Sequence, residues 1–292
     1  MRNALKARRE NIMTELEKTT EVKKHIAPGY KYISELGSGN MGEVFLCERD
    51  GNKFAIKKFR KFERTSDRES VASKFLKVTN KAALIIHPNV VKIIEYGFPI
   101  STETPYIVME YVEGHPLSHY IGSNELSLQK KIDLIKQTTD ALDCIHDCGI
   151  LHRDMKPANI LVENKTGEAK ITDFGISSLL EQNYTTTDNL RGSPAYMAPE
   201  CFESVDKICR ASDIFSLGVL SYELLTGIRP FYGETLAEIM NSIKNDIPVA
   251  PRKIISDIPE NVQKAIEGML RKKPEERLTP QQILSELKCV AK

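Results

Sequence analysis

The chain has 292 residues, of which 41% are hydrophobic and 28% are charged, and its formal net charge at pH 7 is +1. This length and apolar fraction supply enough material for one large core or two smaller ones. The balance of 41 basic against 40 acidic residues excludes the strong positive field expected of a protein that binds nucleic acid or an acidic membrane surface.

Hydropathy and cysteine spacing exclude two further classes. No apolar run approaches the roughly 18 residues needed to cross a bilayer, so the chain as given is expected to be soluble and cytoplasmic, with no membrane span. The cysteines show no close Cys-x-x-Cys pairing and follow no signal peptide, which predicts reduced thiols. They are Cys47, Cys144, Cys148, Cys201, Cys209 and Cys289. Cys144 and Cys148 share one helix face, where ordinary packing is a simpler explanation than a metal or redox site.

Residues 1–28 are predicted to form a charged extension ahead of the first domain, helical over most of its length. Leu5, Ile12, Met13 and Leu16 recur at helical spacing until the sequence HIAPG at 25–29 breaks the pattern. The Arg and Lys content resembles that of a transit peptide, but the acids at 10, 15 and 17 do not fit that acid-poor class. We expect the extension to pack on the domain or on a partner.

Residues 29–109 are predicted to form short strands interrupted by one helix. A glycine-rich stretch, LGSGNMGEV at 36–44, lies among the first strands, and Lys57 lies on the strand that follows. A lone G-x-G-x-x-G also fits a dinucleotide-binding turn, but such a turn leads into a helix, and a strand is predicted here. The helix is marked by apolar residues at three- and four-residue steps: Val71, Phe75, Val78, Ala82 and Ile85.

After residues 110–114 the pattern becomes helical. One apolar stripe has Ser127 placed to cap its start and Gly149 its end; its residues are Leu128, Ile132, Ile135, Leu142 and Ile145. Residues 213–225 are apolar nearly all round and stop at Gly227, which predicts a buried helix. Three polar motifs lie between and around these helices: HRDMKPAN at 152–159, DFG at 173–175 and APE at 198–200.

These motifs, in this order, resemble those of the eukaryotic-type (Hanks-type) protein kinases, and the resemblance covers about residues 30–285. It implies an α+β, bilobal protein-kinase-like fold, with an N-lobe at 29–109, a hinge at 110–114, a C-lobe at 115–285 and a short C-terminal end at 286–292. Residues 105–114 and the sequence Pro157-Ala158-Asn159 look most like bacterial members. Phe215, in contrast, replaces the Trp usual on the buried helix.

The resemblance implies that ATP binds in the cleft between the lobes. Glycines in the loop would let backbone N–H groups approach the phosphates, and Lys57 would hold the α- and β-phosphates. Val44, Ala55, Met109 and Leu161 would enclose the adenine, which the backbone at 110–112 would hydrogen-bond. The implied nucleotide-binding residues are Leu36, Gly37, Ser38, Gly39, Asn40, Met41, Gly42, Glu43, Val44, Ala55, Lys57, Met109, Glu110, Tyr111, Val112 and Leu161.

Four polar residues are assigned by the same resemblance to phosphoryl transfer, a reaction catalysed mainly by positioning and charge neutralisation. Asp154 would orient the substrate hydroxyl and accept its proton, and Lys156 would neutralise charge on the transferred group. Asn159 and Asp173 would bind Mg²⁺ or Mn²⁺, hard ions that prefer carboxylate, amide and phosphate oxygens.

Lys156, two residues after Asp154, resembles the serine/threonine kinases, because tyrosine kinases usually carry Ala-Ala-Arg or Arg-Ala-Ala in that stretch. The Ser193 hydroxyl would then reach Asp154 and Lys156. Pro116 replaces an acid that is common in arginine-directed kinases, so a basic substrate motif is not supported. Protein substrates are expected.

Regulation and one structural ion pair are also implied. A run of three threonines in the activation segment is a predicted autophosphorylation site, and its phosphate would pair with Arg153. The run is Thr185, Thr186 and Thr187. Glu200 and Arg277 would form an ion pair inside the C-lobe.

The helix predicted around residues 71–85 also departs from the family pattern. Counting back from the sequence HPN at 87–89, Val78 occupies the position of the glutamate that pairs with the ATP lysine, and one-residue shifts supply no acid. Glu69 lies nine residues earlier, about 13.5 Å along a helix at about 1.5 Å per residue. Ala82 is also smaller than usual. Val78 and Ala82 favour a pseudokinase that acts as a binding module. An active Ser/Thr kinase is favoured over it because all four expected polar residues are present: Lys57, Asp154, Asn159 and Asp173. A small-molecule phosphotransferase of the same fold is less favoured, because it would have little use for the peptide-docking stretch at 191–200.

Overall fold

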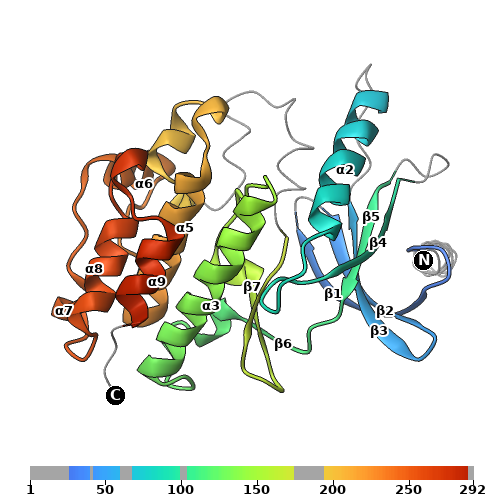
Figure 1. Ribbon diagram of the computed structural model, residues 1–292, viewed down its shortest axis with the longest axis horizontal. Coiled ribbons are helices and arrows are strands. Elements are labelled where there is room, and N and C mark those ends of the chain that lie inside the picture. Colours follow the sequence, from blue (N-terminus) through green and yellow to red (C-terminus); the bar gives the residue numbers. More distant parts are fainter. Residues whose placement is uncertain (1–25, 40–41, 60–67, 99–103, 174–193, 289–292) are drawn as a thin grey trace, which may run out of the picture. The chain divides into compact units, whose positions relative to one another are not determined.

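The computed structural model describes residues 26–39, 42–59, 68–98, 104–173 and 194–288. The chain divides into two compact units, shown in Figure 1. The first contains the described residues up to Ala72 together with Ile93–Tyr111. The second contains Ser73–Lys92 and the described residues from Val112 onward. The helix expected within residues 1–25 lies outside the described residues.

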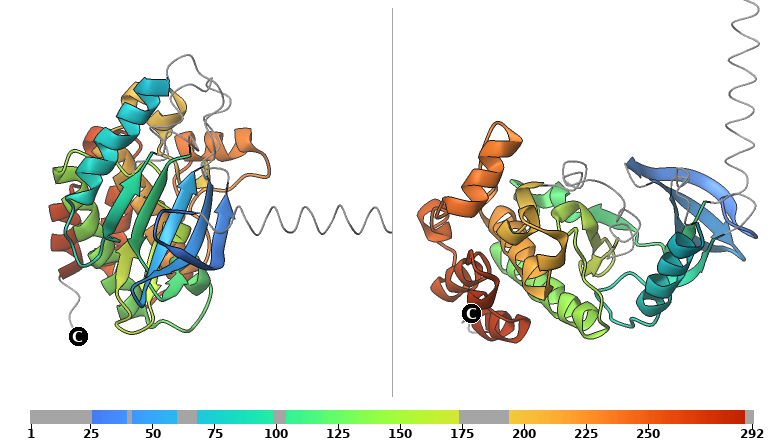
Figure 2. Two further views of the ribbon diagram at one scale, coloured as in Figure 1. Left: turned by 90° about the vertical axis from the view of Figure 1, so that its right-hand side faces the viewer. Right: turned by 90° about the horizontal axis from the view of Figure 1, so that it is seen from above.

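The first unit is built on a five-stranded antiparallel sheet in the order β1-β2-β3-β5-β4, whose strands lie side by side in Figure 2. The strands are β1 Lys31–Gly39, β2 Gly42–Arg49, β3 Asn52–Phe59, β4 Ile93–Gly97 and β5 Tyr106–Glu110. Arg49 pairs with Asn52 across a two-residue turn in which Asp50 and Gly51 both have positive φ, 52° and 76°. Asp-Gly at these two positions matches the twist of a tight hairpin, which explains the sharp reversal.

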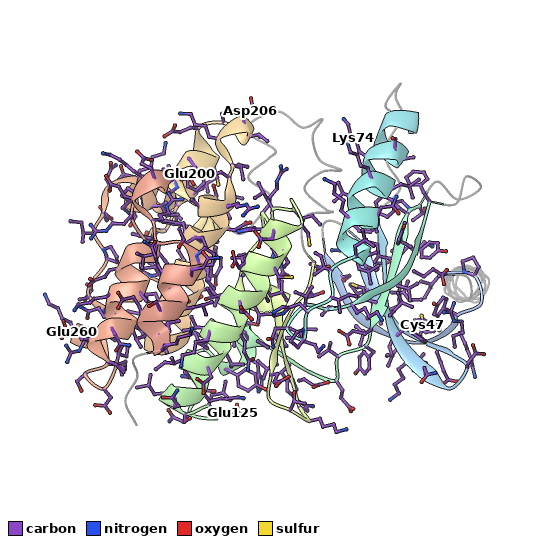
Figure 3. All side chains as sticks on the ribbon, viewed as in Figure 1. Cys47, Lys74, Glu125, Glu200, Asp206 and Glu260 are labelled. Atoms are coloured by element: carbon purple, nitrogen blue, oxygen red, sulfur yellow. The ribbon has the colours of Figure 1, made fainter. Side chains whose placement is uncertain are left out.

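One face of this sheet carries the apolar core of the first unit. The core residues are Ile26, Ala27, Tyr30, Phe45, Cys47, Ile56, Tyr106 and Val108. Cys47, labelled in Figure 3, is completely buried. Ile26 and Ala27 belong to the stretch assigned to the extension from sequence, yet both are buried here. The chain therefore enters the sheet core before Gly29.

A polar cluster fixes this entry point. Arg49 Nη1 donates to Glu95 Oε2 at 2.8 Å, and the hydroxyls of Tyr30 and Tyr106 each donate to the same carboxylate at 3.2 Å. The Arg49 guanidinium also lies 4.3 Å from the centroid of the Tyr30 ring. Because burial and the Glu95 charge disfavour the phenolate, the pKa of Tyr30 rises to about 12, so its hydroxyl stays a donor at neutral pH.

The second unit is mainly helical. Its helices are α2 Arg68–Ala83, of which Ser73 onward belongs to this unit, α3 Leu128–Asp147, α5 Arg210–Thr226, α6 Leu236–Asn245, α7 Pro251–Ile254, α8 Glu260–Met269 and α9 Pro280–Lys288. Helix α5 contacts α3, α7 and α8 (Figure 1). Gly218 allows that close approach, since a Cβ there would lie 2.8 Å from Met269 Cβ. The buried helix expected at 213–225 is thus confirmed.

Local signals also placed the helix ends. Ser127 is the N-cap of α3 and its hydroxyl accepts the Lys130 N–H at 3.2 Å, while Gly149 follows the helix with φ 71°. Gly227 ends α5 with φ 78°, in the left-handed region that glycine adopts without a steric cost. Short 3-10 helices connect the main elements: η1 Leu117–Tyr120, η2 Pro157–Asn159, η4 Pro194–Tyr196, η5 Pro199–Phe202, η6 Val205–Lys207 and η7 Pro274–Glu276.

A three-stranded sheet of β6 Gly114–Pro116, β7 Ile160–Glu163 and β8 Ala169–Ile171 completes the second unit. The segment after α2 is tied to it: Asn89 Nδ2 donates to the Ala169 carbonyl at 2.7 Å, and Val90 forms a bridge with Ile171. These bonds explain why Ser73–Lys92 group with the second unit, whereas the sequence placed them within a continuous N-lobe at 29–109.

The apolar stripe predicted for α2 is present where its side chains are described. Phe75, Ala82 and Ile85 are buried, and Val78 is half-buried. Thr79, which lies between the stripe positions, is also fully buried and donates its hydroxyl to the Phe75 carbonyl at 2.8 Å. Among the described helices, none is long and apolar enough to cross a membrane.

Candidate active site

A buried carboxylate on α5 anchors the loop that carries the HRD motif. The backbone N–H groups of His152 and Arg153 donate to the two oxygens of Asp213, each at 2.8 Å, and His146 Nε2 lies 2.8 Å from the same group. Burial alone would raise the pKa of Asp213, but the hydrogen bond and charge of His146 and the backbone donors outweigh it and hold the pKa below its usual value. The loop therefore rests on an ionised carboxylate.

His152 connects this loop to the strand that precedes the DFG motif. Its Nδ1 accepts the Asp154 N–H at 3.2 Å, and its Nε2 lies 3.1 Å from the Thr172 carbonyl oxygen. Burial lowers the pKa of His152, which favours the neutral ring. A neutral imidazole protonated on Nε2 satisfies both contacts. His152 therefore holds the two segments together and does not act as a titrating base.

Asp154 and its neighbours form a compact polar cluster. Lys156 Nζ lies 2.7 Å from Asp154 Oδ2, and Asn159 Nδ2 donates to that same oxygen at 2.9 Å and to the Asp154 carbonyl at 2.8 Å. Two donors on one oxygen fix the carboxylate in a single orientation. Because the Asn159 nitrogen faces Asp154, its amide oxygen is the atom available for a cation.

The β7–β8 ladder brings the two expected metal ligands to one edge. Ile160 is paired with Ile171, so the start of β7 and the end of β8 lie at the same end of the antiparallel ladder. Asn159 directly precedes β7 and Asp173 lies two residues after β8, so both are at that end. The Thr172 N–H donates to the Asn159 carbonyl at 2.9 Å, which ties the two loops together. Phe174 and Gly175 lie outside the described residues.

In the first unit, four residues expected to bind nucleotide share one face of the sheet. Val44 pairs with Lys57, and Ala55 pairs with Met109. Since directly paired residues and those two apart on a strand point to the same side, all four lie on the face opposite the apolar core. Lys57 is only 7% exposed. The sheet register thus places a buried cation beside three apolar residues.

The glycine-rich hairpin shows two kinds of glycine. Gly42 has φ 150°, and a Cβ there would overlap the Lys58 carbonyl oxygen, so the close approach of β3 requires glycine. Gly37 and Gly39 would meet nothing among the described residues within 4 Å. Packing in the described structure therefore does not require glycine at these two positions. Leu36, Ser38 and Glu43 are exposed, and Asn40 and Met41 lie outside the described residues.

The remaining nucleotide-binding candidates occupy the segments expected for them. Glu110 ends β5, Tyr111 is half-buried after it, and Val112 is buried at the start of the second unit. Leu161 lies on β7, where it pairs with Lys170 and is half-buried.

The ion pair predicted between Glu200 and Arg277 is confirmed. Arg277 Nη1 and Nη2 donate to the two oxygens of Glu200 at 2.6 and 2.7 Å, and the Ser212 hydroxyl donates to Glu200 Oε1 at 2.7 Å. Glu200, labelled in Figure 3, lies on η5. The Arg277 guanidinium also lies 5.0 Å from the centroid of the Phe215 ring, the aromatic side chain found here in place of Trp.

Several assigned residues fall outside the described residues. They are Thr185, Thr186, Thr187 and Ser193, and their positions are therefore untested. Arg153 is described and has φ 64°, a left-handed conformation that is uncommon for arginine. Sequence reasoning missed the roles of Asp213 and His146. A charged residue within an otherwise apolar helix was the available signal for Asp213, because a buried carboxylate needs partners.

This sheet with its glycine-rich hairpin, together with the helical unit and its polar loops, has the architecture of a protein kinase. The sequence family described as the protein kinase domain matches residues 30–287. The chain belongs to this family.

Known relatives agree with that assignment. The serine/threonine-protein kinase PknA of Mycobacterium tuberculosis is 37% identical over 253 residues, which cover 84% of this chain and 57% of PknA. The serine/threonine-protein kinase PrkC of Bacillus subtilis is 35% identical over 256 residues, 86% of this chain and 38% of PrkC. The chain thus spans about half the length, or less, of these relatives.

A solved structure shares the fold. The crystal structure of Rad53 1-466 in complex with AMP-PNP superposes with a TM-score of 0.73 and 28% sequence identity, and the match covers 88% of this chain and 64% of that one.

Proposed function

We propose that this chain is an ATP-dependent protein kinase that transfers the γ-phosphate to serine and threonine hydroxyls of proteins. The observation that carries the proposal is the cluster in which Lys156 and Asn159 hold one oxygen of Asp154 at 2.7 and 2.9 Å. That geometry leaves the second carboxylate oxygen to receive a substrate hydroxyl. The relatives named above as serine/threonine kinases support the reaction, and Lys156 supports the choice of hydroxyl.

ATP is proposed to bind on the sheet face formed by Val44, Ala55, Lys57 and Met109. The open sites at Gly37 and Gly39 suit close contact between backbone N–H groups and phosphate oxygens. Lys57 would hold the α- and β-phosphates, and the segment at 110–112 would hydrogen-bond the adenine. The AMP-PNP bound to Rad53 in its crystal structure supports this assignment.

Asn159 and Asp173 fit a divalent cation. An amide oxygen and a carboxylate are hard donors of the kind that Mg²⁺ prefers. The described residues contain no group of three or more His, Cys, Asp or Glu suited to holding a metal, so phosphate and water oxygens would complete the coordination. A bound Mg²⁺ neutralises charge on the phosphates during transfer.

The residues of this chain then perform three tasks. Asp154 orients the hydroxyl and accepts its proton late in the transfer, which a weak base can do because the transition state is loose. Lys156 stabilises the charge on the transferred group. Asp213 and His152 keep the loop in place before the substrate arrives.

Val78 favours a second candidate, a nucleotide-binding module with weak or no turnover. One experiment separates the readings: incubation with radiolabelled ATP, Mg²⁺ and a generic protein substrate, followed by phosphoamino-acid analysis, for the wild type and Asp154→Asn. We expect labelled phosphoserine and phosphothreonine that Asp154→Asn abolishes. ATP binding without label on protein would support the binding module, and label on small molecules alone would support the phosphotransferase.

We further propose that the domain extends from about residue 29 to 285 and that proteins are its substrates. Residues 1–28 are proposed to dock on the domain or on a partner. Ile26 and Ala27, buried in the sheet core, support an attachment at the end of that segment. A cytoplasmic location is also proposed.

A further inference from the structure

The strand β8 leads into Asp173, and one of its two edges faces away from the strands of its sheet. Glu168 and Thr172, on either side of the strand, bond toward β7 through their backbone groups. In an antiparallel ladder the bonding direction alternates, so the backbone groups of Ala169 and Ile171 point away from β7. Both residues are completely buried, and each of these N–H and carbonyl groups therefore needs a partner within the protein.

All of these outward groups have a partner, and two of the partners are side-chain amides. The Ile171 N–H donates to the Asn89 carbonyl, and the Ile171 carbonyl accepts the Val91 N–H, both at 2.8 Å. The Ala169 carbonyl accepts from Asn89 Nδ2 at 2.7 Å, and the Ala169 N–H donates to Gln137 Oε1 at 2.8 Å. On this edge, backbone groups therefore hold the end of β8, whereas the two amides hold its start.

The two amides come from separate elements and act as a pair. Asn89 lies in the segment after α2 and is only 7% exposed, and Gln137 lies half-buried on α3, which packs against β8. Asn89 Nδ2 also lies 3.5 Å from Gln137 Oε1. Neutral amides supply a donor for the carbonyl and an acceptor for the N–H. An apolar side chain at either position would leave one buried backbone group of Ala169 without its partner, which is unfavourable.

The attachment of the start of β8 affects its end, because the strand has only three residues. The Thr172 N–H donates to the Asn159 carbonyl at 2.9 Å, and His152 Nε2 lies 3.1 Å from the Thr172 carbonyl oxygen. Bonds near one end hold a strand at that end, and a second point of attachment sets its direction. If Ala169 were released, β8 would be free to turn about Thr172, and Asp173 would move relative to Asn159.

We propose that Asn89 and Gln137 are positioning residues for the divalent cation. By holding the start of β8, they set where Asp173 lies relative to Asn159. This inference rests on the proposed function, in which Asp173 and Asn159 bind Mg²⁺ or Mn²⁺. Replacing a residue that orients a metal ligand without touching the metal commonly costs about 10- to 100-fold in metal affinity. The two amides act through the strand and not on the ligand itself, so we expect a loss at the lower end of that range, about tenfold.

Binding of Mn²⁺ to the full chain in the presence of AMP-PNP tests the inference without any turnover. Electron paramagnetic resonance of free Mn²⁺ gives the dissociation constant. We expect Asn89→Leu and Gln137→Met, which remove the donor and the acceptor, to raise this constant about tenfold. Gln137→Glu keeps an acceptor for the Ala169 N–H and should stay within about twofold of the wild type. Asn261→Leu is the matched control and should leave the constant unchanged, because it removes a bond of the same kind, from Asn261 Nδ2 to the Glu286 carbonyl at 2.6 Å.

A purely structural role for the two amides predicts a different pattern. Wild-type Mn²⁺ affinity in folded Asn89→Leu and Gln137→Met would overturn the inference alone, and so would an equal loss in Gln137→Glu or in Asn261→Leu. If Asn89→Leu does not fold, the comparison of Gln137→Met with Gln137→Glu still decides, because Gln137 is half-buried and tolerates exchange. Circular dichroism and AMP-PNP affinity without metal should match the wild type in each folded variant.

Failure of the proposed function gives a separate result. A wild type that binds Mn²⁺ no more tightly than AMP-PNP does by itself would overturn the proposed metal site, and the inference with it. Tight binding by the wild type that every variant shares would leave the metal site standing and overturn only the role of Asn89 and Gln137.

Discussion

At the scale of single residues, the polar loops hold uncommon backbone conformations. Arg153 and Asp173 have φ values of 64° and 62°, which a residue with a side chain adopts at a cost of about 1 kcal/mol or more. The Arg153 N–H bond to Asp213, at 2.8 Å, offsets part of this cost. Such conformations persist where surrounding structure fixes them, and Asp213 supplies that support for the loop that carries the HRD motif.

Val78 is the residue that the sequence places where the family carries a glutamate, and Val78→Glu tests that alignment. We expect kcat/KM to rise about three- to fivefold, because the family pattern has a glutamate at this position and one further charged contact is worth about 1 kcal/mol. Val78 is half-buried, so the change should be tolerated. Steady-state kinetics should be measured beside Leu76→Glu, an exposed position on α2 that receives the same charge.

Equal kinetics in Val78→Glu and Leu76→Glu would contradict the expectation that a glutamate at position 78 improves turnover. Loss of folding in Val78→Glu alone would show that Val78 acts as core. A crystal structure with Glu69 within about 4 Å of the Lys57 ammonium would also refute the register, because that distance marks an ion pair.

Single residues were predictable to different degrees from sequence. Asp154, Lys156 and Asn159 lie within six positions of one another, so one motif named all three and the structure brings them into contact. Asp213 contacts the same loop from about sixty residues away. The charge of Asp213 within an apolar helix signals a buried carboxylate that needs partners, but the sequence does not say which residues those partners are.

At the scale of elements, the Glu200–Arg277 ion pair joins η5 to the residue that follows η7. Arg277→Met leaves the Glu200 carboxylate buried with Ser212 as its remaining donor, and we expect a loss of about 3–5 kcal/mol in the free energy of unfolding. Urea denaturation at pH 7 measures it. Arg271→Met, which removes an exposed charge, is the control and should change the free energy by less than about 0.5 kcal/mol.

The pH dependence of this pair has a definite sign. Burial raises the pKa of Glu200, but hydrogen bonds from Arg277 and Ser212 outweigh it and leave the pKa below its usual value. A depressed carboxyl pKa contributes stability above the unfolded pKa and loses it as the pH falls through the folded pKa. The difference between wild type and Arg277→Met should therefore shrink below about pH 4.5. A constant difference down to pH 3 would contradict the assignment.

Lys272, which lies between α8 and η7, contacts α6 and predicts a second pH trend of the same sign in a higher pH range. Its Nζ donates to the Ile243 carbonyl at 2.6 Å and lies 4.0 Å from the centroid of the Phe231 ring. Burial lowers its pKa to about 8. Between about pH 8 and 10.5 the unfolded chain binds the extra proton, so the wild type should gain stability relative to Lys272→Met as the pH rises through this window.

Thermal or urea unfolding between pH 7 and 10 measures this trend. Lys273→Met, which removes an exposed neighbouring amine, should show no such slope. A pH-independent difference for Lys272→Met would show that burial does not depress the pKa of this amine.

Element ends were more predictable than element partners. Ser127 and the two glycines at 149 and 227 signal helix boundaries through local backbone chemistry, and each was placed correctly. The grouping of Ser73–Lys92 depends on Asn89 and Val90 bonding to β8, some eighty residues later. Propensity carries no information on such pairings.

At the scale of the whole molecule, the account predicts that the protein activates itself. Phosphate on the run from Thr185 to Thr187 would add about −1.5 to −2 charge and pair with Arg153. We expect mass spectrometry to find phosphate on this run after incubation with ATP and Mg²⁺, and to find none in Asp154→Asn. Phosphate elsewhere on the wild type but not on these threonines would contradict autoactivation at this site.

Under the proposed function, phosphoryl transfer requires Lys57, which belongs to the first unit, and Asp173, which belongs to the second. The most direct test is the initial rate of γ-phosphate transfer to a protein substrate for wild type, Lys57→Met and Asp173→Ala. Each change removes a charge aimed at the phosphates, so the account predicts losses of at least ~10²-fold, about 2.7 kcal/mol, with the fold intact by circular dichroism. Undiminished transfer by Asp173→Ala would contradict the central claim.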